Sequence, residues 1–179
     1  SSQAFYGSAP VLLDLGSQVL SGTDDVVAIS SSTLAVSVLL AGATPNFAAS
    51  IGSSVLFSIS NQSAVSFANL YRTDGTAPGT QLVTTIPNLV SSPAFLTAVG
   101  SNVFFVAYTN PGHGRELWVT DGTAVGTMEV KDIRSGLASS SPGQLTAVGS
   151  TLYFTANDGT NGTELWKWDG TELGTTMVQ

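Results

Sequence analysis

The chain has 179 residues and a formal net charge of −7, with only 9% charged residues, one histidine and no cysteine. With five basic residues it lacks the positive surface that nucleic acid or anionic lipid attracts. The absence of cysteine excludes disulfides and thiolate metal sites, and a single histidine excludes a histidine-rich metal cage. We therefore expect no nucleic-acid partner, and composition alone names no reaction.

The most hydrophobic stretch comes early, at residues 26–43. It is uncharged and close to the length of a membrane span, but serine and threonine interrupt it and β-branched residues fill many of its apolar positions. This pattern favours two short strands joined by a serine turn. We expect no membrane insertion.

The remainder of the chain repeats itself with a period of about 48 residues. One marker is a proline-led segment ending in glycine, at 43–52, 91–100 and 140–149. The other is an Asp-Gly-Thr turn followed by Gly-Thr, which begins at Asp74, Asp121 and Asp169. A fainter copy precedes them. The single domain 1–179 is thus predicted to contain four repeats, at about 1–42 (degenerate), 43–90, 91–139 and 140–179.

Each repeat is predicted to form four short strands, which in the last copy lie at 144–148, 151–156, 164–168 and 175–178. Helical periodicity is absent. The predicted fold is all-β and β-propeller-like, each repeat being a four-stranded antiparallel blade, with a stacked β-solenoid as the alternative. A four-bladed ring would close if residues 1–8 or 34–40 paired beside the last strand. An open fragment would expose strand edges and self-associate.

The run from Asp158 to Thr175 resembles the ELWxxDGT repeat family of bacterial secreted and cell-surface proteins. Its core reads Glu-Leu-Trp-Lys-Trp-Asp-Gly-Thr at 164–171, and the resemblance extends over about 43–179. The first full copy departs from it, because Asn-Leu-Tyr replaces Glu-Leu-Trp at 69–71. The resemblance implies an extracellular, propeller-like repeat module, and it supplies no catalytic residue.

The three repeated aspartates, Asp74, Asp121 and Asp169, fill the same position in each copy and are therefore interpreted as structural turn residues. Their carboxylates are expected to accept hydrogen bonds from nearby backbone N–H groups and from the threonine two residues on. A repeated calcium site is the alternative, since these turns are rich in oxygen ligands.

The best candidate calcium cluster lies in the loop and strand that follow residue 157: Asp158, Asn161 and Glu164. It lacks the spacing of an EF-hand. Calcium is thus the one cofactor left open, and no other is expected.

Residues that differ from their counterparts in the other repeats are the candidate binding residues, because a residue type shared by every copy is most simply structural. Trp168 stands where the other copies have Thr73 and Thr120, and it is predicted either to be exposed and stack on a sugar face or to make a hydrophobic contact with a missing neighbour. His113 and Arg115 lie in a glycine-flanked loop and are further candidate ligand contacts. The alternative for His113 is an exposed side chain without a role.

Glu116 and Glu164 each begin a Leu-Trp strand. Either they are edge carboxylates paired with the backbone or an arginine, or they are the acid/base pair of a glycoside hydrolase. Asn69 breaks the series and no nucleophile motif is present, so no catalytic residue is assigned. The leading hypothesis is a non-catalytic extracellular module for adhesion or for binding a glycan or cell-surface protein. A structural spacer in a longer repeat array is the alternative, and a glycan-acting hydrolase is third.

Overall fold

The computed structural model describes residues 13–14, 18–21, 26–30, 36–40, 44–60, 69–84, 86, 88–91, 93–171 and 174–178, with backbone only up to residue 44 and at Ser60. Within these residues the regular structure is entirely β-strand, in four sheets of four antiparallel strands. This confirms the all-β prediction and its four-stranded antiparallel repeats. The same residues include no helix long and apolar enough to cross a bilayer.

The strands of each sheet follow one another in chain order. The first sheet contains β1 (Leu13–Asp14), β2 (Gln18–Ser21), β3 (Val26–Ser30) and β4 (Val36–Leu40). The second contains β5 (Thr44–Ile51), β6 (Ser54–Ser60), β7 (Asn69–Thr73) and β8 (Gln81–Thr84). The third contains β9 (Ala94–Val99), β10 (Asn102–Thr109), β11 (Gly114–Thr120) and β12 (Met128–Lys131). The fourth contains β13 (Gly143–Val148), β14 (Thr151–Asn157), β15 (Thr163–Trp168) and β16 (Thr176–Met177).

The hydrophobic stretch 26–43 forms two strands, β3 and β4, which pair with each other as the serine-turn pattern predicts. Among the described residues β4 and β16 are edge strands of two different sheets, so the structure does not show ring closure through residues 34–40. The hydrophobic pattern of 34–40 fits its own hairpin as well as it would fit a distant edge. The other closing segment considered, 1–8, lies outside the described residues.

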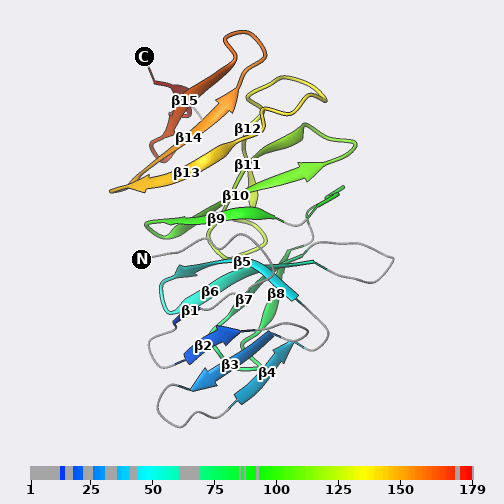
Figure 1. Ribbon diagram of the computed structural model, residues 1–179, viewed down its shortest axis with the longest axis vertical. Helices are drawn as coiled ribbons and strands as arrows, with labels where there is room; N and C mark the ends of the chain where they lie inside the picture. Colours follow the sequence, from blue (N-terminus) through cyan, green and yellow to red (C-terminus); the bar gives the residue numbers. More distant parts are fainter. Residues whose placement is uncertain are drawn as a thin grey trace.

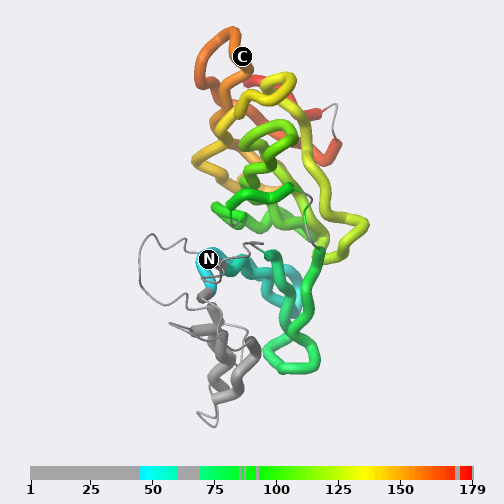
Figure 2. Tube along the Cα trace, turned by 90° about the vertical axis from the view of Figure 1, so that its right-hand side faces the viewer, coloured from blue at the N-terminus to red at the C-terminus, as the bar shows by residue number. Residues whose placement is uncertain are grey.

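The sheets are stacked in chain order along the long axis of the molecule, with β1–β4 and β13–β16 at opposite ends (Figure 1). The view turned by 90° shows the same succession for the later sheets, from cyan β5 to the red C-terminal strand (Figure 2). Neighbouring sheets meet most closely at their first strands, β5 beside β9 and β9 beside β13.

The third sheet has two apolar faces, because successive side chains of a strand point to opposite sides. We call the face toward the preceding sheet the leading face and the face toward the following sheet the trailing face. On β10, Phe105 lies on the leading face and packs in a core with Leu56 and Leu70 of the preceding sheet. Its neighbour Phe104 packs on the other side, with Leu152 and other residues of the following sheet. This arrangement explains strands that are apolar at consecutive positions, as in sheets covered on both sides.

Candidate functional site

A cavity of about 320 Å³ lies between the third and fourth sheets, at the end of β15 where Trp168 stands. Its size is at the lower end of the range of small-molecule sites, about 300–1,000 Å³. The third sheet and its β11–β12 turn supply most of the wall, and Trp168 and Gly170 of the fourth supply the rest. The lining residues are Asn102, Val119, Asp121, Gly126, Met128, Glu129, Val130, Trp168 and Gly170.

The preceding repeat has a smaller cavity, of about 170 Å³, at the equivalent place. Each residue that lines the smaller cavity has its equivalent in the lining of the larger one when the repeats are aligned on their Asp-Gly-Thr turns, for example Ser54 with Asn102 and Gln81 with Met128. The decisive difference is that Arg72 occupies the position of Val119. The Arg72 side chain reaches the next turn, so that a Cβ atom added to Gly122 would lie 3.5 Å from the arginine Cδ.

Two departures from the repeat therefore enlarge the 320 Å³ cavity and give it an aromatic wall. Valine in place of arginine leaves space at position 119, and tryptophan in place of threonine puts an indole on the facing wall. Trp168 is half-buried, and its ring meets Phe104 edge-on with centroids 4.7 Å apart at 64°. This contact holds the indole in place while part of it faces the cavity.

Polar groups border the indole in the lining. Asn102 offers an amide, and Asp121 and Glu129 offer carboxylates. Two hydrogen bonds from Thr123 to Asp121 Oδ1, one from the backbone nitrogen (2.9 Å) and one from the hydroxyl (2.7 Å), lower the pKa of Asp121 and keep it ionised. An aromatic surface beside amide and carboxylate groups can take an apolar ring face and its hydroxyl groups together.

The repeated aspartates organise the turns that carry this wall. Asp74 accepts the same two hydrogen bonds from Thr76, at 2.9 and 2.7 Å, and these bonds lower its pKa. Asp169 accepts a longer one from the Thr171 hydroxyl, at 3.3 Å. In this arrangement the carboxylates stabilise their own turns.

The loop proposed for calcium is closed by its own hydrogen bonds. Both Thr160 and Asn161 donate backbone N–H groups to Asp158 Oδ1, each at 2.8 Å, and the Asn161 amide nitrogen donates to Asp158 Oδ2 at 2.7 Å. These bonds lower the pKa of Asp158. The amide thus turns a donor toward the carboxylate, where a calcium ion would need its oxygen. Glu164 is half-buried on the adjoining strand β15.

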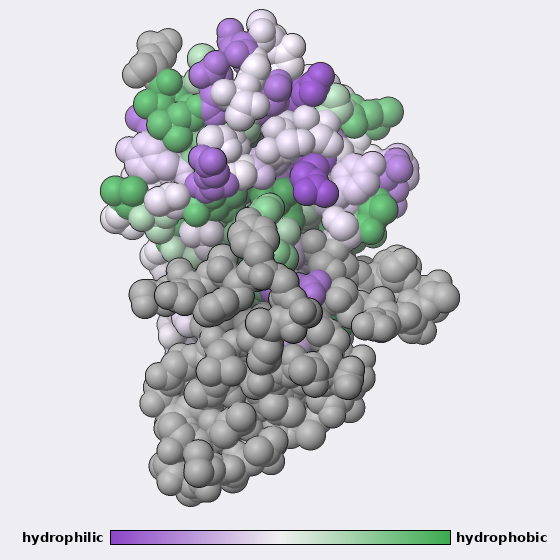
Figure 3. Space-filling model, viewed as in Figure 1, coloured by the Kyte–Doolittle hydropathy of each residue, from purple (hydrophilic) through white to green (hydrophobic). Residues whose placement is uncertain are grey.

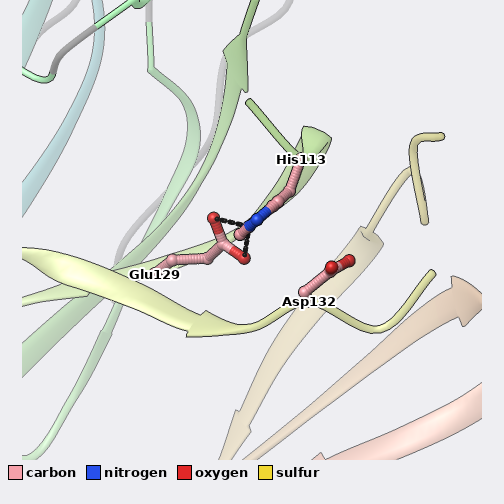
Figure 4. Close-up of side chains that lie close together, drawn as sticks. All are labelled: His113, Glu129 and Asp132. Atoms are coloured by element: carbon pink, nitrogen blue, oxygen red, sulfur yellow. Dashed lines mark hydrogen bonds and ion pairs between the residues drawn. The ribbon is translucent and has the colours of Figure 1, made fainter. Parts of the chain in front are cut away.

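His113 is exposed and forms an ion pair with Glu129, whose two carboxylate oxygens lie 2.9 and 3.1 Å from the histidine Nδ1 (Figure 4). The hydrogen bond and charge of Glu129 raise the pKa of His113. His113 is exposed, as the sequence analysis expected, and the structure adds a carboxylate partner to it. Sequence patterns gave no sign of it, because Glu129 lies on another strand.

Asp132 completes a group with His113 and Glu129 in which one ligand atom from each residue lies within 4.8 Å of the others. Asp132 Oδ2 accepts a hydrogen bond from Gly136 N at 3.1 Å, whereas its buried Oδ1 has no hydrogen-bond partner. One imidazole and two carboxylates are a ligand set that a divalent transition metal accepts. A metal would have to replace the ion pair that His113 and Glu129 make with each other.

Neither His113 nor Arg115 lines the Trp168 cavity, and Glu129 is the residue common to the cavity and the histidine pair. Arg115 is exposed, and its backbone N–H donates to Ser139 Oγ at 2.9 Å. The structure thus separates Trp168 from the other two candidate ligand contacts.

Glu116 is fully buried and accepts hydrogen bonds from the backbone nitrogen of Ser140, at 2.6 Å, and from the Ser140 hydroxyl. Burial raises its pKa to about 7, although the bonds from Ser140 act in the opposite direction. This confirms the prediction of a carboxylate paired with backbone. Glu164 is its equivalent on the adjacent sheet, at the same position of β15.

A comparison of the chain with protein-family models finds no match, and a comparison with curated proteins finds none above the significance threshold. The functional argument therefore rests on the geometry of the molecule. The lining residues Val119 and Asn102 were not among the sequence-based candidates. A position-by-position comparison of the repeats contains the signal for Val119, since the other copies carry Arg72 and Lys167 there.

Proposed function

We propose that this protein is a non-catalytic binding module that takes a carbohydrate in the cavity beside Trp168. The single observation that carries the proposal is the cavity's construction by two departures from an otherwise repeated wall, one removing a long side chain and one adding an indole. Substitutions that served only to fill a core would reduce the cavity. Val119 and Trp168 together leave open space next to an aromatic surface and polar groups, as sugar-binding sites require.

The expected location is outside the cell, as the resemblance to the ELWxxDGT repeats implies, and the expected ligands are glycans or glycosylated surface proteins. We infer further that the sheets are propeller-type blades. Supporting this inference are the four antiparallel strands in chain order in each sheet and the approach of successive sheets through their first strands. Small-angle scattering would test it, because blades arranged about an axis give a curved particle and a solenoid gives a straight one.

A glycan array followed by calorimetric titration tests the binding function. Two variants restore the sequence of the other repeats: Val119→Arg refills the cavity and Trp168→Thr removes the indole. Each should weaken binding of an array-identified sugar at least tenfold, because each removes space or stacking surface. Lys167→Arg is the matched control, since Lys167 is exposed and adjacent to Trp168 on β15 without lining the cavity.

The array is run with and without calcium, so that dependence on the ion is read from the same experiment. An array that is flat under both conditions would favour a structural spacer and overturn the proposal. Binding that survives both Val119→Arg and Trp168→Thr would also overturn it, because the sugar would then occupy another surface. Release of reducing ends from a bound glycan would favour the hydrolase.

A further inference from the structure

Three polar side chains of the third repeat come together at one end of its β11–β12 hairpin. His113 lies in the loop that leads into β11, Glu129 lies on β12, and Asp132 directly follows β12. Because β11 and β12 are antiparallel, the end of β12 lies beside the beginning of β11, and the three side chains are neighbours (Figure 4). One ligand atom from each residue lies within 4.8 Å of the other two. The topology thus places one imidazole and two carboxylates at a single point of the hairpin.

All three residues differ from their equivalents in other repeats. Glu129 stands where the neighbouring repeats have Leu82 and Met177, at the same register position beside the preceding strand. His113 stands where the fourth repeat has asparagine, and Asp132 stands where the second repeat has threonine. A residue that only builds the sheet is expected in every copy. Three replacements that meet at one point therefore indicate a function of the third repeat that its neighbours lack.

Asp132 supplies an independent sign that this point holds a cation. Its Oδ2 accepts a hydrogen bond from Gly136 N at 3.1 Å, whereas its Oδ1 is buried and has no hydrogen-bond partner among the described residues. Leaving a buried carboxylate oxygen without a partner is costly, and such an atom in a native protein is commonly explained by a bound ion or water. No lysine or arginine of the described residues forms a salt bridge with Asp132. A bound cation satisfies both the oxygen and its charge.

We propose that His113, Glu129 and Asp132 bind a zinc-like divalent metal ion, the imidazole through Nδ1 and the carboxylates through oxygen. Zinc bonds of about 2.0–2.2 Å hold neighbouring ligand atoms roughly 3 Å apart. His113 Nδ1 lies 2.9 and 3.1 Å from the two oxygens of Glu129, so this pair has the separation that a shared metal needs. The His113 side chain is 51% exposed, which leaves its ring room to turn toward Asp132. In the metal-bound protein the ion takes the place of the hydrogen that His113 and Glu129 share.

The imidazole selects the kind of metal. Calcium takes six to eight oxygen ligands, whereas zinc accepts nitrogen and oxygen together at four positions. Three protein ligands leave the fourth position, on the exposed side of His113, for water or for a group from a ligand or partner. The Gly136 N–H orients the Asp132 carboxylate, as hydrogen bonds from outside the ligand set do in metal sites. Glu129 also lines the Trp168 cavity, but the metal is tested without sugar, so its outcome does not depend on the proposed function.

Calorimetric titration of zinc into the whole chain, first freed of metal with a chelator, tests the site. The wild type should bind one zinc ion per chain, and zinc should raise its melting temperature, because an ion that binds only the folded state stabilises it. Background binding should be low, because the chain has one histidine and no cysteine. On the described part of the face in Figure 3, hydrophilic side chains, drawn purple, are scattered and form no single patch. A wild type that binds no zinc overturns the proposal.

Three variants carry residues that other repeats have at the same positions, so they should keep the fold, as circular dichroism checks: His113→Asn, Glu129→Leu and Asp132→Thr. Each should weaken zinc binding at least tenfold and remove most of the rise in melting temperature. Asp158→Asn is the matched control and should bind zinc like the wild type, because it removes an exposed carboxylate that does not belong to the cluster. If any of the three variants binds zinc as tightly as the wild type, that residue is not a ligand and the proposed site is wrong.

The single histidine gives a second readout that needs no variant. In long-range ¹H–¹⁵N spectra, zinc should shift the Nδ1 resonance of His113 and leave Nε2 protonated. Zinc on Nε2 would place the ion away from the atom that faces Glu129 and contradict the geometry. A tenfold excess of calcium should leave the zinc bound. Displacement by calcium would show a site made of oxygen ligands alone and overturn the proposal.

Discussion

Glu116 illustrates how one residue joins two repeats. Its carboxylate lies in the apolar interior, where ionisation is costly, and it binds both the backbone nitrogen and the hydroxyl of Ser140 at the start of the segment that leads to the fourth sheet. Asn69 holds the same position in the second sheet, and its buried Oδ1 has no hydrogen-bond partner. The Glu116 carboxylate thus links the third sheet to the fourth through its hydrogen bonds with Ser140.

The raised pKa of Glu116 makes the contribution of this residue to folding stability depend on pH. In the unfolded chain Glu116 loses its proton near 4.5, whereas in the folded protein it holds the proton up to about 7. Its contribution to stability is fully present below pH 4.5 and is lost as the pH rises through 7. Glu116→Gln keeps the shape without the charge, so we expect its melting temperature to fall less than that of the wild type between pH 4.5 and 7.5.

Thermal unfolding of both proteins across this range checks the prediction. Asp158→Asn is the control, since it removes a carboxylate from an exposed loop of the next sheet. Identical pH profiles for the wild type and Glu116→Gln would contradict the burial-raised pKa.

Residues differ in how far the sequence alone predicted them. The pairing of Glu116 with backbone was predictable, because the residue begins a repeated strand that must join its neighbour. The His113–Glu129 pair was not, because the 16 intervening residues include a strand and a turn whose path fixes the contact. One wall of the cavity could be predicted and the other could not. Trp168 stands out in the sequence because a large aromatic residue replaces threonine, whereas Val119 contributes by lacking the long side chain that Arg72 has at the same position.

At the scale of elements, the Asp-Gly-Thr-x-x-Gly-Thr turn is the unit that the chain reuses most faithfully. In the third sheet Asp121 accepts from Thr123, and the Thr123 hydroxyl accepts from the Gly126 N–H at 3.0 Å. The second sheet repeats each bond with the same lengths. Such a closed set of local bonds is readable in sequence because every donor and acceptor lies within a few residues. The strand positions on either side were accordingly predicted to within one or two residues.

This turn explains why its second glycine recurs. A Cβ atom at Gly126 would lie 2.1 Å from Asp121 Oδ1, and the carboxylate could move aside only by breaking the two hydrogen bonds that it accepts from Thr123. Gly126→Ala should therefore destabilise the protein by about 1–3 kcal/mol, as overpacking does. Gly143→Ala is the control, since its nearest contact would be 3.4 Å from Thr155 Oγ1.

Chemical denaturation of the single and double variants measures this effect. If the clash with the carboxylate is the cause, Gly126→Ala should cost less in an Asp121→Ala background, because the clashing oxygens are gone. A cost that is unchanged in the double variant would point to the backbone and contradict the steric explanation.

At the scale of the molecule, the third sheet is stabilised by contacts on both faces, and the order of the chain is the order of the stack. Phe104 and Phe105 are neighbours in β10, each 0% exposed, yet they belong to different cores. Phe105 joins the third sheet to the second, and Phe104 joins it to the fourth. In a repeat protein such interfaces contribute separately to stability. Trimming one of these phenylalanines should therefore loosen one interface in particular.

We expect Phe104→Ala and Phe105→Ala each to destabilise the protein by about 3–5 kcal/mol, since both remove a fully buried ring. Hydrogen exchange should distinguish them. Phe104→Ala should speed exchange chiefly in β14, and Phe105→Ala chiefly in β6, because each variant opens the sheet that lost its contact. The two variants control for each other, as they remove the same atoms from adjacent positions. Equal acceleration in all sheets by both variants would mean that the stack unfolds as one unit, and the interfaces would then not be separable.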